Sequence, residues 1–208
     1  MLLAHHTEAI SVLASLELDA EKLIEVVRYA DSERALCTSA DPRGFDLITM
    51  NARAARGLRE AFGGERWHFD EKDNQAGIRN PHNKVRVIHC NFDRNCCDST
   101  NSPTNLAEKG AASRMKVASN QAWIPGLPVP DHQEDSEYTT WVLGTHYDKD
   151  GDTLFAELSR PVTFTAGRYT RFEQRIVLLD GRGTSLAPND RREREGPTEI
   201  VDIVIARK

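Results

Sequence analysis

The sequence predicts an α+β fold in which N-terminal helices pack on a mainly antiparallel β-sheet. Two observations lead to this prediction. Residues 7–62 carry apolar side chains at helical spacing, whereas strand-like alternation dominates from residue 139 onward. A regular succession of strand, helix and strand, which would indicate a doubly wound parallel fold, is not evident.

The 208 residues suit one compact domain. Within it we predict a helical region with a central strand and a long polar loop (1–124), a proline-rich, acidic linker (125–137) and a β-rich region (138–208). No apolar run approaches the ~20 residues that span a membrane, and the N-terminus lacks a signal-peptide pattern. We therefore expect a soluble, cytoplasmic protein without a membrane partner. A net charge of −5 argues against a globally basic nucleic-acid binder but permits a local basic surface.

Two helical stretches are predicted in the first third of the chain. Apolar residues recur every three or four positions over 7–29, and Asp19 would cap a second segment after a break near Leu18. This stripe should pack on the domain's own core, although it would also suit a homo-oligomer. Asp41 followed by proline indicates the start of the next helix, and Gly63-Gly64 would end it with positive φ. The expected buried face of that helix consists of Phe45, Ile48, Ala52, Ala55, Leu58 and Phe62.

The centre of the chain predicts an interior strand followed by a long loop. Residues 84–90 alternate with apolar side chains on both faces, which is typical of a strand flanked by two others. The polar loop at 91–105 is longer than most loops in compact domains, and such loops are often functional. Helix-forming residues follow over 106–123.

The C-terminal part predicts a β-hairpin and further strands. Residues 139–147 and 153–158 should pair around the turn 148–152, and 162–165 and 172–179 should extend the sheet, as should a last strand containing Val201, Ile203 and Ile205. The turn has carboxylates spaced like the start of a calcium loop. However, Thr153 stands where the sixth-position glycine belongs and Ser159 where the glutamate belongs, so a hairpin turn is the better interpretation.

Two histidines and three cysteines near the central strand have the donor atoms of a zinc site. They are not spaced like one, because no C-x₂₋₄-C pair is present and adjacent Cys96 and Cys97 do not easily reach one tetrahedral ion. We therefore predict no metal ligands and no cofactor, and expect reduced thiols. The donor atoms belong to His82, His89, Cys90, Cys96 and Cys97.

The preferred functional hypothesis is a binding or accessory protein that docks a protein or nucleic-acid partner. Arginines interleaved with Tyr169 and Phe172 on the predicted C-terminal strands resemble the way in which single-strand binders hold phosphates and stack bases. The partner-binding residues that we predict are Arg160, Arg168, Arg171 and Arg175.

The alternative hypothesis is a small hydrolase or nuclease. His82 and His89 would activate water or a nucleophile, and Asp93 would orient a histidine or help to hold a divalent metal. Neither a G-x-G-x-x-G motif nor a G-x-x-x-x-G-K-[ST] motif is present, which argues against nucleotide use by those routes. Whether the protein is an enzyme is left open by the sequence.

Overall fold

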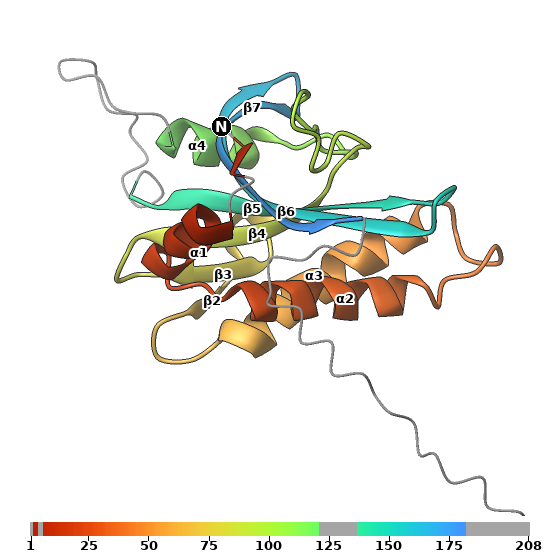
Figure 1. The fold of residues 1–208 in the computed structure, drawn as a ribbon, viewed down its shortest axis with the longest axis horizontal. Coiled ribbons are helices and arrows are strands. Elements are labelled where there is room, and N and C mark those ends of the chain that lie inside the picture. The colour runs from red at the N-terminus through yellow and green to blue at the C-terminus, as the bar shows by residue number, and fades with distance from the viewer. Residues whose placement is uncertain (1, 4–5, 121–136, 182–208) are drawn as a thin grey trace, which may run out of the picture.

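The computed structural model describes residues 2–3, 6–120 and 137–181 of the chain. It confirms the α+β class: helices near the N-terminus pack on a mainly antiparallel sheet (Figure 1). Residues 125–136 of the expected linker, and the expected strand at 201–205, lie outside the described residues. No helix in the described ranges is long and apolar enough to cross a bilayer.

Within the described ranges, seven strands form one sheet in the order β1-β7-β6-β5-β4-β3-β2. The β4–β5 and β1–β7 pairs are parallel, and the other pairs are antiparallel. Strands from both sides of the expected linker are therefore neighbours in one sheet. The bounds are β1 Leu2–Leu3, β2 His68–Asp70, β3 Gly77–Asn80, β4 Val85–Asn91, β5 Thr139–Asp148, β6 Thr153–Thr165 and β7 Arg168–Asp180.

The helices cover the two faces of the sheet unequally. Helices α1 (His6–Ser15), α2 (Ala20–Arg34) and α3 (Phe45–Phe62) lie on one face, and the short α4 (Ala111–Ser119) lies on the other (Figure 1). A 3₁₀ turn, η1, spans Lys72–Asn74. Each face has its own apolar core, and β4 contributes to both: Val87 belongs to the larger core under the helices and Ile88 to the smaller core on the opposite face.

The predicted break between the first two helices is confirmed. Helix α1 ends at Ser15 and α2 begins at Ala20, with Asp19 as its N-cap. The Lys22 amide donates to Asp19 Oδ1 at 2.9 Å. This bond satisfies one of the backbone donors that the first turn of a helix leaves without an intrahelical partner.

The prediction for the start of α3 is wrong. The helix begins at Phe45 after Gly44 (φ 80°), whereas Asp41 accepts a hydrogen bond from the Thr38 amide at 2.7 Å and organises the preceding turn. The predicted buried face is wrong in its first half, because Phe45 is 40% and Ile48 63% exposed and Ala52 is exposed as well. The residues of α3 that are buried instead are Met50, Ala54, Ala55, Gly57 and Leu58.

The end of α3 falls where the glycines predict it, for a different reason. Gly63 has φ −53°, so it does not use a left-handed conformation. A Cβ atom at this position would lie 2.3 Å from the Arg59 carbonyl oxygen, which forbids any larger residue without a shift of the backbone. Close packing, and not positive φ, explains the glycine.

The predicted interior strand and hairpin are confirmed. Strand β4 lies between β3 and β5, and six of its seven residues are buried. Strands β5 and β6 pair from Asp148↔Thr153 to Val142↔Ser159. Pro161 lies beyond this paired part at a register shift against β7, where its missing N–H costs no ladder bond to β5.

Candidate functional site

The three predicted catalytic residues do not come together. His82 is exposed in the turn before β4, and Asp93 follows the far end of that strand. A strand of seven residues separates them by about 20 Å. Asp93 accepts hydrogen bonds from Thr104 Oγ1 at 2.8 Å and from the Asn95 amide at 3.1 Å, so it shapes the loop.

His89 occupies a buried position between a helix and a strand. Its Nδ1 lies 3.0 Å from Asn51 Oδ1 on α3, and its Nε2 lies 2.9 Å from Thr145 Oγ1 on β5. Burial, and to a smaller extent the charge of Lys109, lowers the pKa of His89 to about 3. The imidazole is therefore neutral at neutral pH. An Nδ1–H that donates to Asn51 leaves Nε2 to accept from Thr145.

The four predicted partner-binding arginines do not form one surface. Arg171 is exposed, but Arg160 pairs with Glu173 at 3.1 Å, and Arg168 donates to the Asn105 carbonyl. Arg175 is only 5% exposed, so its guanidinium is not presented to solvent.

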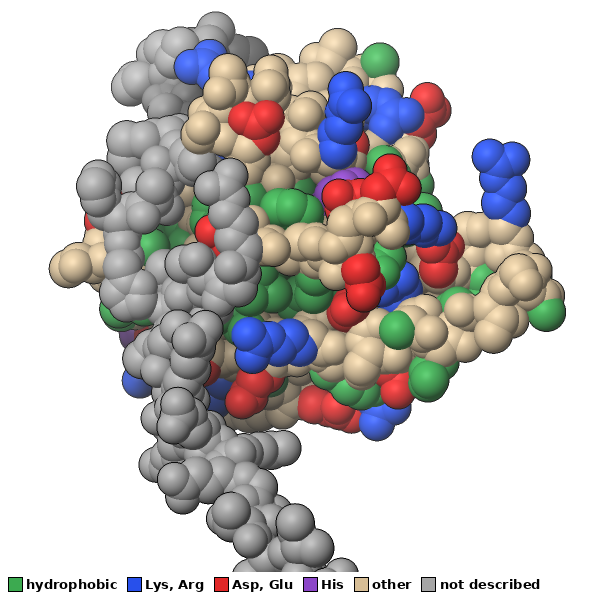
Figure 2. All heavy atoms as spheres, turned by 45° about the vertical axis from the view of Figure 1, so that its right-hand side comes forward, with side chains coloured by type: hydrophobic (Ala, Val, Ile, Leu, Met, Phe, Trp, Pro, Cys, Tyr) green, Lys and Arg blue, Asp and Glu red, His purple; other side chains and the backbone are tan. Residues whose placement is uncertain are grey.

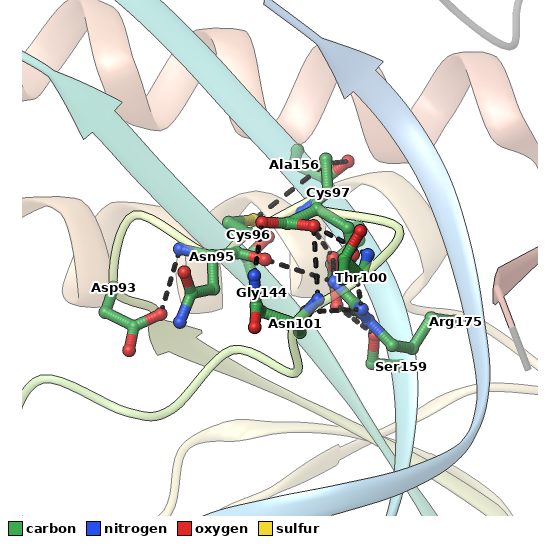
Figure 3. Close-up of polar contacts among 12 residues, drawn as sticks. Asp93, Asn95, Cys96, Cys97, Thr100, Asn101, Gly144, Ala156, Ser159 and Arg175 are labelled. Atoms are coloured by element: carbon green, nitrogen blue, oxygen red, sulfur yellow. Dashed lines mark hydrogen bonds and ion pairs between the residues drawn. The ribbon is translucent and has the colours of Figure 1, made fainter.

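Arg175 instead anchors the long polar loop. It donates to both carboxylate oxygens of Glu157, at 2.8 and 2.6 Å, and Glu157 is fully buried. Its remaining hydrogen bonds go to the carbonyl oxygens of Asn95, Asp98 and Asn101 (Figure 3). One buried guanidinium thus ties three carbonyl groups of the long polar loop to the sheet.

A cleft of about 360 Å³ opens where three stretches of the chain meet: the α2–α3 connection with the start of α3, the end of β4 with the loop after it, and the end of β5 with the start of β6. Thr145 lies in its wall, and the hydroxyl of this residue joins the cleft to His89 behind it. A second hollow continues from it along the α2–α3 connection. The residues that line the cleft include Arg34, Arg43, Leu47, Thr145, Tyr147 and Lys149.

The cations of the cleft differ in how far they are already neutralised. Arg34 lies 3.5 Å above the centre of the Tyr147 ring and pairs with Asp31 at 2.7 Å. Lys149 lies 3.4 Å from Asp46. Arg43 forms no ion pair or side-chain hydrogen bond with any described residue. It is therefore the cation of this cleft best placed to pair with an incoming anion.

Exposed apolar residues lie in and next to the segments that form the cleft, and two of them, Leu47 and Leu106, line it. Figure 2 brings this side of the molecule forward and shows hydrophobic, basic and acidic side chains interspersed over it. Three of the apolar residues belong to the first turn of α3, one to the connection before it and one to the loop after β4. They are Phe45, Leu47, Ile48, Leu36 and Leu106, between 37% and 74% exposed.

Sequence reasoning missed this cleft because its walls come from residues 34–50, 91–106 and 145–154. The sequence signal for this part of the cleft was Gly44, which follows Arg43. A glycine there permits the positive φ at which α3 begins. Comparison with family models, with curated proteins and with solved structures found no match for this chain.

Proposed function

We propose that this chain is a binding protein whose cleft captures a protein segment with a carboxylate next to apolar side chains. The observation that carries the proposal is the exposed apolar first turn of α3 beside Arg43, which has no ion-pair partner among the described residues. Contiguous apolar groups at the surface of a folded chain are a typical mark of an interaction site.

The apolar turn supplies the energy of such an interaction. Ile48 is 63% exposed and Phe45 is 40% exposed, so both side chains have surface left to bury. Full burial of side chains of this size is worth about 1.5–3 kcal/mol each. A partner that covers the turn would gain a substantial part of that energy.

Arg43 supplies the preference for an acidic partner. Guanidinium groups bind carboxylates with two parallel hydrogen bonds, which adds geometric selection to the charge attraction. Arg34 and Lys149 already have acidic neighbours in this chain. We therefore expect the partner to place one carboxylate, the one that pairs with Arg43.

Nucleic acid fits this surface less well. The basic side chains on this side are interspersed with acidic ones (Figure 2), whereas a nucleic-acid site gathers basic groups in one patch. The Tyr147 ring also carries the Arg34 guanidinium on one face, so that face cannot stack on a base. The wall of the cleft includes the aliphatic side chains of Leu47, Met50, Leu106 and Leu154, which favour protein side chains as partners.

The experiment is a selection of binders from a displayed library of random peptides with the full chain as bait. Enriched peptides should carry Asp or Glu near apolar residues. Ile48→Asp and Arg43→Glu should each weaken binding of an enriched peptide at least about tenfold, which corresponds to 1.4 kcal/mol. Arg171→Glu is the matched control, because it makes the same charge change at an exposed arginine of β7 and should leave binding unchanged.

Three outcomes would overturn the proposal. The first is that no peptide is enriched, and the second is that Arg171→Glu weakens binding as much as Arg43→Glu does. The third is that single-stranded DNA or RNA oligonucleotides bind more tightly than the selected peptides, which would transfer the function to a nucleic-acid partner.

A hydrolase is the second candidate, favoured by one specific observation. Thr145, His89 and Asn51 form a chain of hydrogen bonds in the order hydroxyl, imidazole, orienting amide, and Thr145 faces the cleft. This order matches that of nucleophile, base and orienting residue in acyl-transfer enzymes. His82 and Asp93 take no part, because β4 separates them.

The candidate hydrolase has a clear weakness and a clear test. A base with a pKa of about 3 is far below the operating pH at which general-base catalysis is efficient. Wild type should hydrolyse members of a panel of carboxylic esters and phosphodiesters, and His89→Gln should abolish that turnover while the fold persists by circular dichroism. Absence of turnover in the wild type, or unchanged turnover in His89→Gln, would remove this candidate.

A further inference from the structure

Two adjacent cysteines of the long loop and one glutamate of β6 bring their donor atoms together beneath the loop (Figure 3). Three donor atoms lie within 4.8 Å of one another: the Sγ atoms of Cys96 and Cys97 and one carboxylate oxygen of Glu157. Cys96 and Glu157 are buried, and Cys97 is partly exposed, which leaves one side of the cluster open to approach. Thiolate sulfur and carboxylate oxygen are both zinc ligands.

The backbone explains how neighbouring cysteines can face the same point. In an extended chain, successive side chains point in opposite directions. Cys97 instead has φ 64°, a left-handed conformation that is uncommon for residues other than glycine, asparagine and aspartate. This turn directs both sulfurs to one side and places them 4.0 Å apart.

The separation of the sulfurs suits a tetrahedral ion. Zinc–sulfur bonds of about 2.3 Å at tetrahedral angles place two thiolates about 3.8 Å apart. The observed 4.0 Å thus requires only a small adjustment. From the sequence we expected that adjacent cysteines do not easily reach one ion. That expectation assumed an extended backbone, whereas Cys97 has a left-handed conformation.

Glu157 is held in place for this role by three neighbours. Arg175 binds both of its carboxylate oxygens, Ser159 Oγ donates to Oε1 at 2.6 Å, and the Cys97 amide donates to Oε2 at 2.6 Å. Hydrogen bonds of this kind orient a carboxylate, and because they occupy both lone pairs of each oxygen, an ion that binds Glu157 must displace one of them. The net charge of the occupied site would be zero, as a buried site requires. Two thiolates and one carboxylate balance one guanidinium and one divalent cation.

Further oxygen donors border the cluster. The carbonyl oxygens of Ala156 and Leu179 each lie 3.3 Å from Cys97 Sγ. In a tetrahedral shell a sulfur and an oxygen ligand are about 3.6 Å apart, from bond lengths of about 2.3 and 2.1 Å. Each carbonyl therefore lies at a distance from Cys97 Sγ that is close to the one a fourth ligand would have.

We propose that Cys96, Cys97 and Glu157 bind one thiophilic divalent cation of the zinc class, which ties the long loop to β6. This site is separate from the cleft and does not rest on the function proposed for it. In the competing arrangement, the Cys97 thiol simply donates its hydrogen to the Ala156 or Leu179 carbonyl, and the cluster is ordinary packing of reduced cysteines.

The test uses the full chain, reduced and freed of metal with a chelator, and then titrated with Zn²⁺ and with Cd²⁺. One ion should bind per chain, and Cd²⁺ should produce the ultraviolet charge-transfer band of a thiolate complex. Zn²⁺ should also protect Cys97, the partly exposed thiol of the pair, from alkylation, as read by mass spectrometry, while Cys37 remains labelled. Both readouts use the wild-type protein and so do not depend on the folding of any variant.

Variants then assign the ligands. Cys96→Ser and Cys97→Ser should each weaken Zn²⁺ affinity by more than about 100-fold, because loss of an outer-shell partner alone costs 10–100-fold. Cys37→Ser, outside the cluster, is the matched control and should bind as wild type does. No stoichiometric binding, no protection of Cys97, or equal loss in the control would overturn the proposal.

Discussion

Replacing Arg175 with methionine is expected to destabilise the protein by about 3–5 kcal/mol, because it leaves the Glu157 carboxylate buried without its cation. The magnitude follows from the structure: Arg175 is 5% and Glu157 0% exposed, so water cannot replace the lost partner. The carbonyl oxygens of Asn95, Asp98 and Asn101 would lose their guanidinium donor in the same step. The loop should therefore loosen before the sheet does.

Urea unfolding at neutral pH measures the first effect, and backbone amide hydrogen exchange over residues 93–104 measures the second. Arg171→Met is the control, since it removes an exposed arginine from the same strand and should change the free energy of unfolding by less than about 0.5 kcal/mol. The double variant Glu157→Gln/Arg175→Met should cost less than the two single variants together, because it removes the stranded charge. A loss below about 1 kcal/mol for Arg175→Met, with unchanged loop exchange, would refute the reasoning.

Three further predictions concern stability. Below pH 6.5 the unfolded chain protonates His89 while the folded chain keeps it neutral down to about pH 3. Over that range wild type should therefore lose about 1.4 kcal/mol per pH unit more than His89→Gln does, measured by urea unfolding at several pH values; parallel pH profiles would contradict this. Gly144→Ala would place a Cβ atom 2.0 Å from the Phe92 ring and should cost about 1–3 kcal/mol by thermal unfolding, whereas an unchanged melting temperature would show that the ring moves freely. Asp19→Ala removes the bond from the Lys22 amide and should cost about 0.5–2 kcal/mol in urea unfolding, with Asp19→Asn as the control that keeps a capping oxygen.

Apolar periodicity predicts much of the fold, because it reflects which face of an element is buried. The break before α2 and the interior position of β4 both follow from local patterns. The start of α3 does not, because Asp41 followed by proline is a valid start signal that a competing turn uses instead. Ile48 fits the apolar periodicity of α3, but its side chain is exposed to solvent. Periodicity alone therefore does not show which apolar residues of this helix are buried.

The candidate sites depend on contacts that sequence patterns do not contain. The Cys97 amide meets a Glu157 side chain sixty residues away, on a strand of the C-terminal hairpin. His89 reaches Thr145 because β4 and β5 are parallel neighbours, whereas the chain order alone does not specify that pairing. Residue type and strand position direct attention to His89, but only the structure identifies Asn51 and Thr145 as its partners.

The most direct measurement of the central claim is amide hydrogen exchange of the full chain with and without a selected peptide. The peptide should slow exchange at residues 43–50 and 145–149, which border the cleft, and Ile48→Asp should abolish that protection. Residues 168–175 of β7 should show no change. Protection confined to β7, with none at the start of α3, would contradict the assignment of the cleft as the binding site.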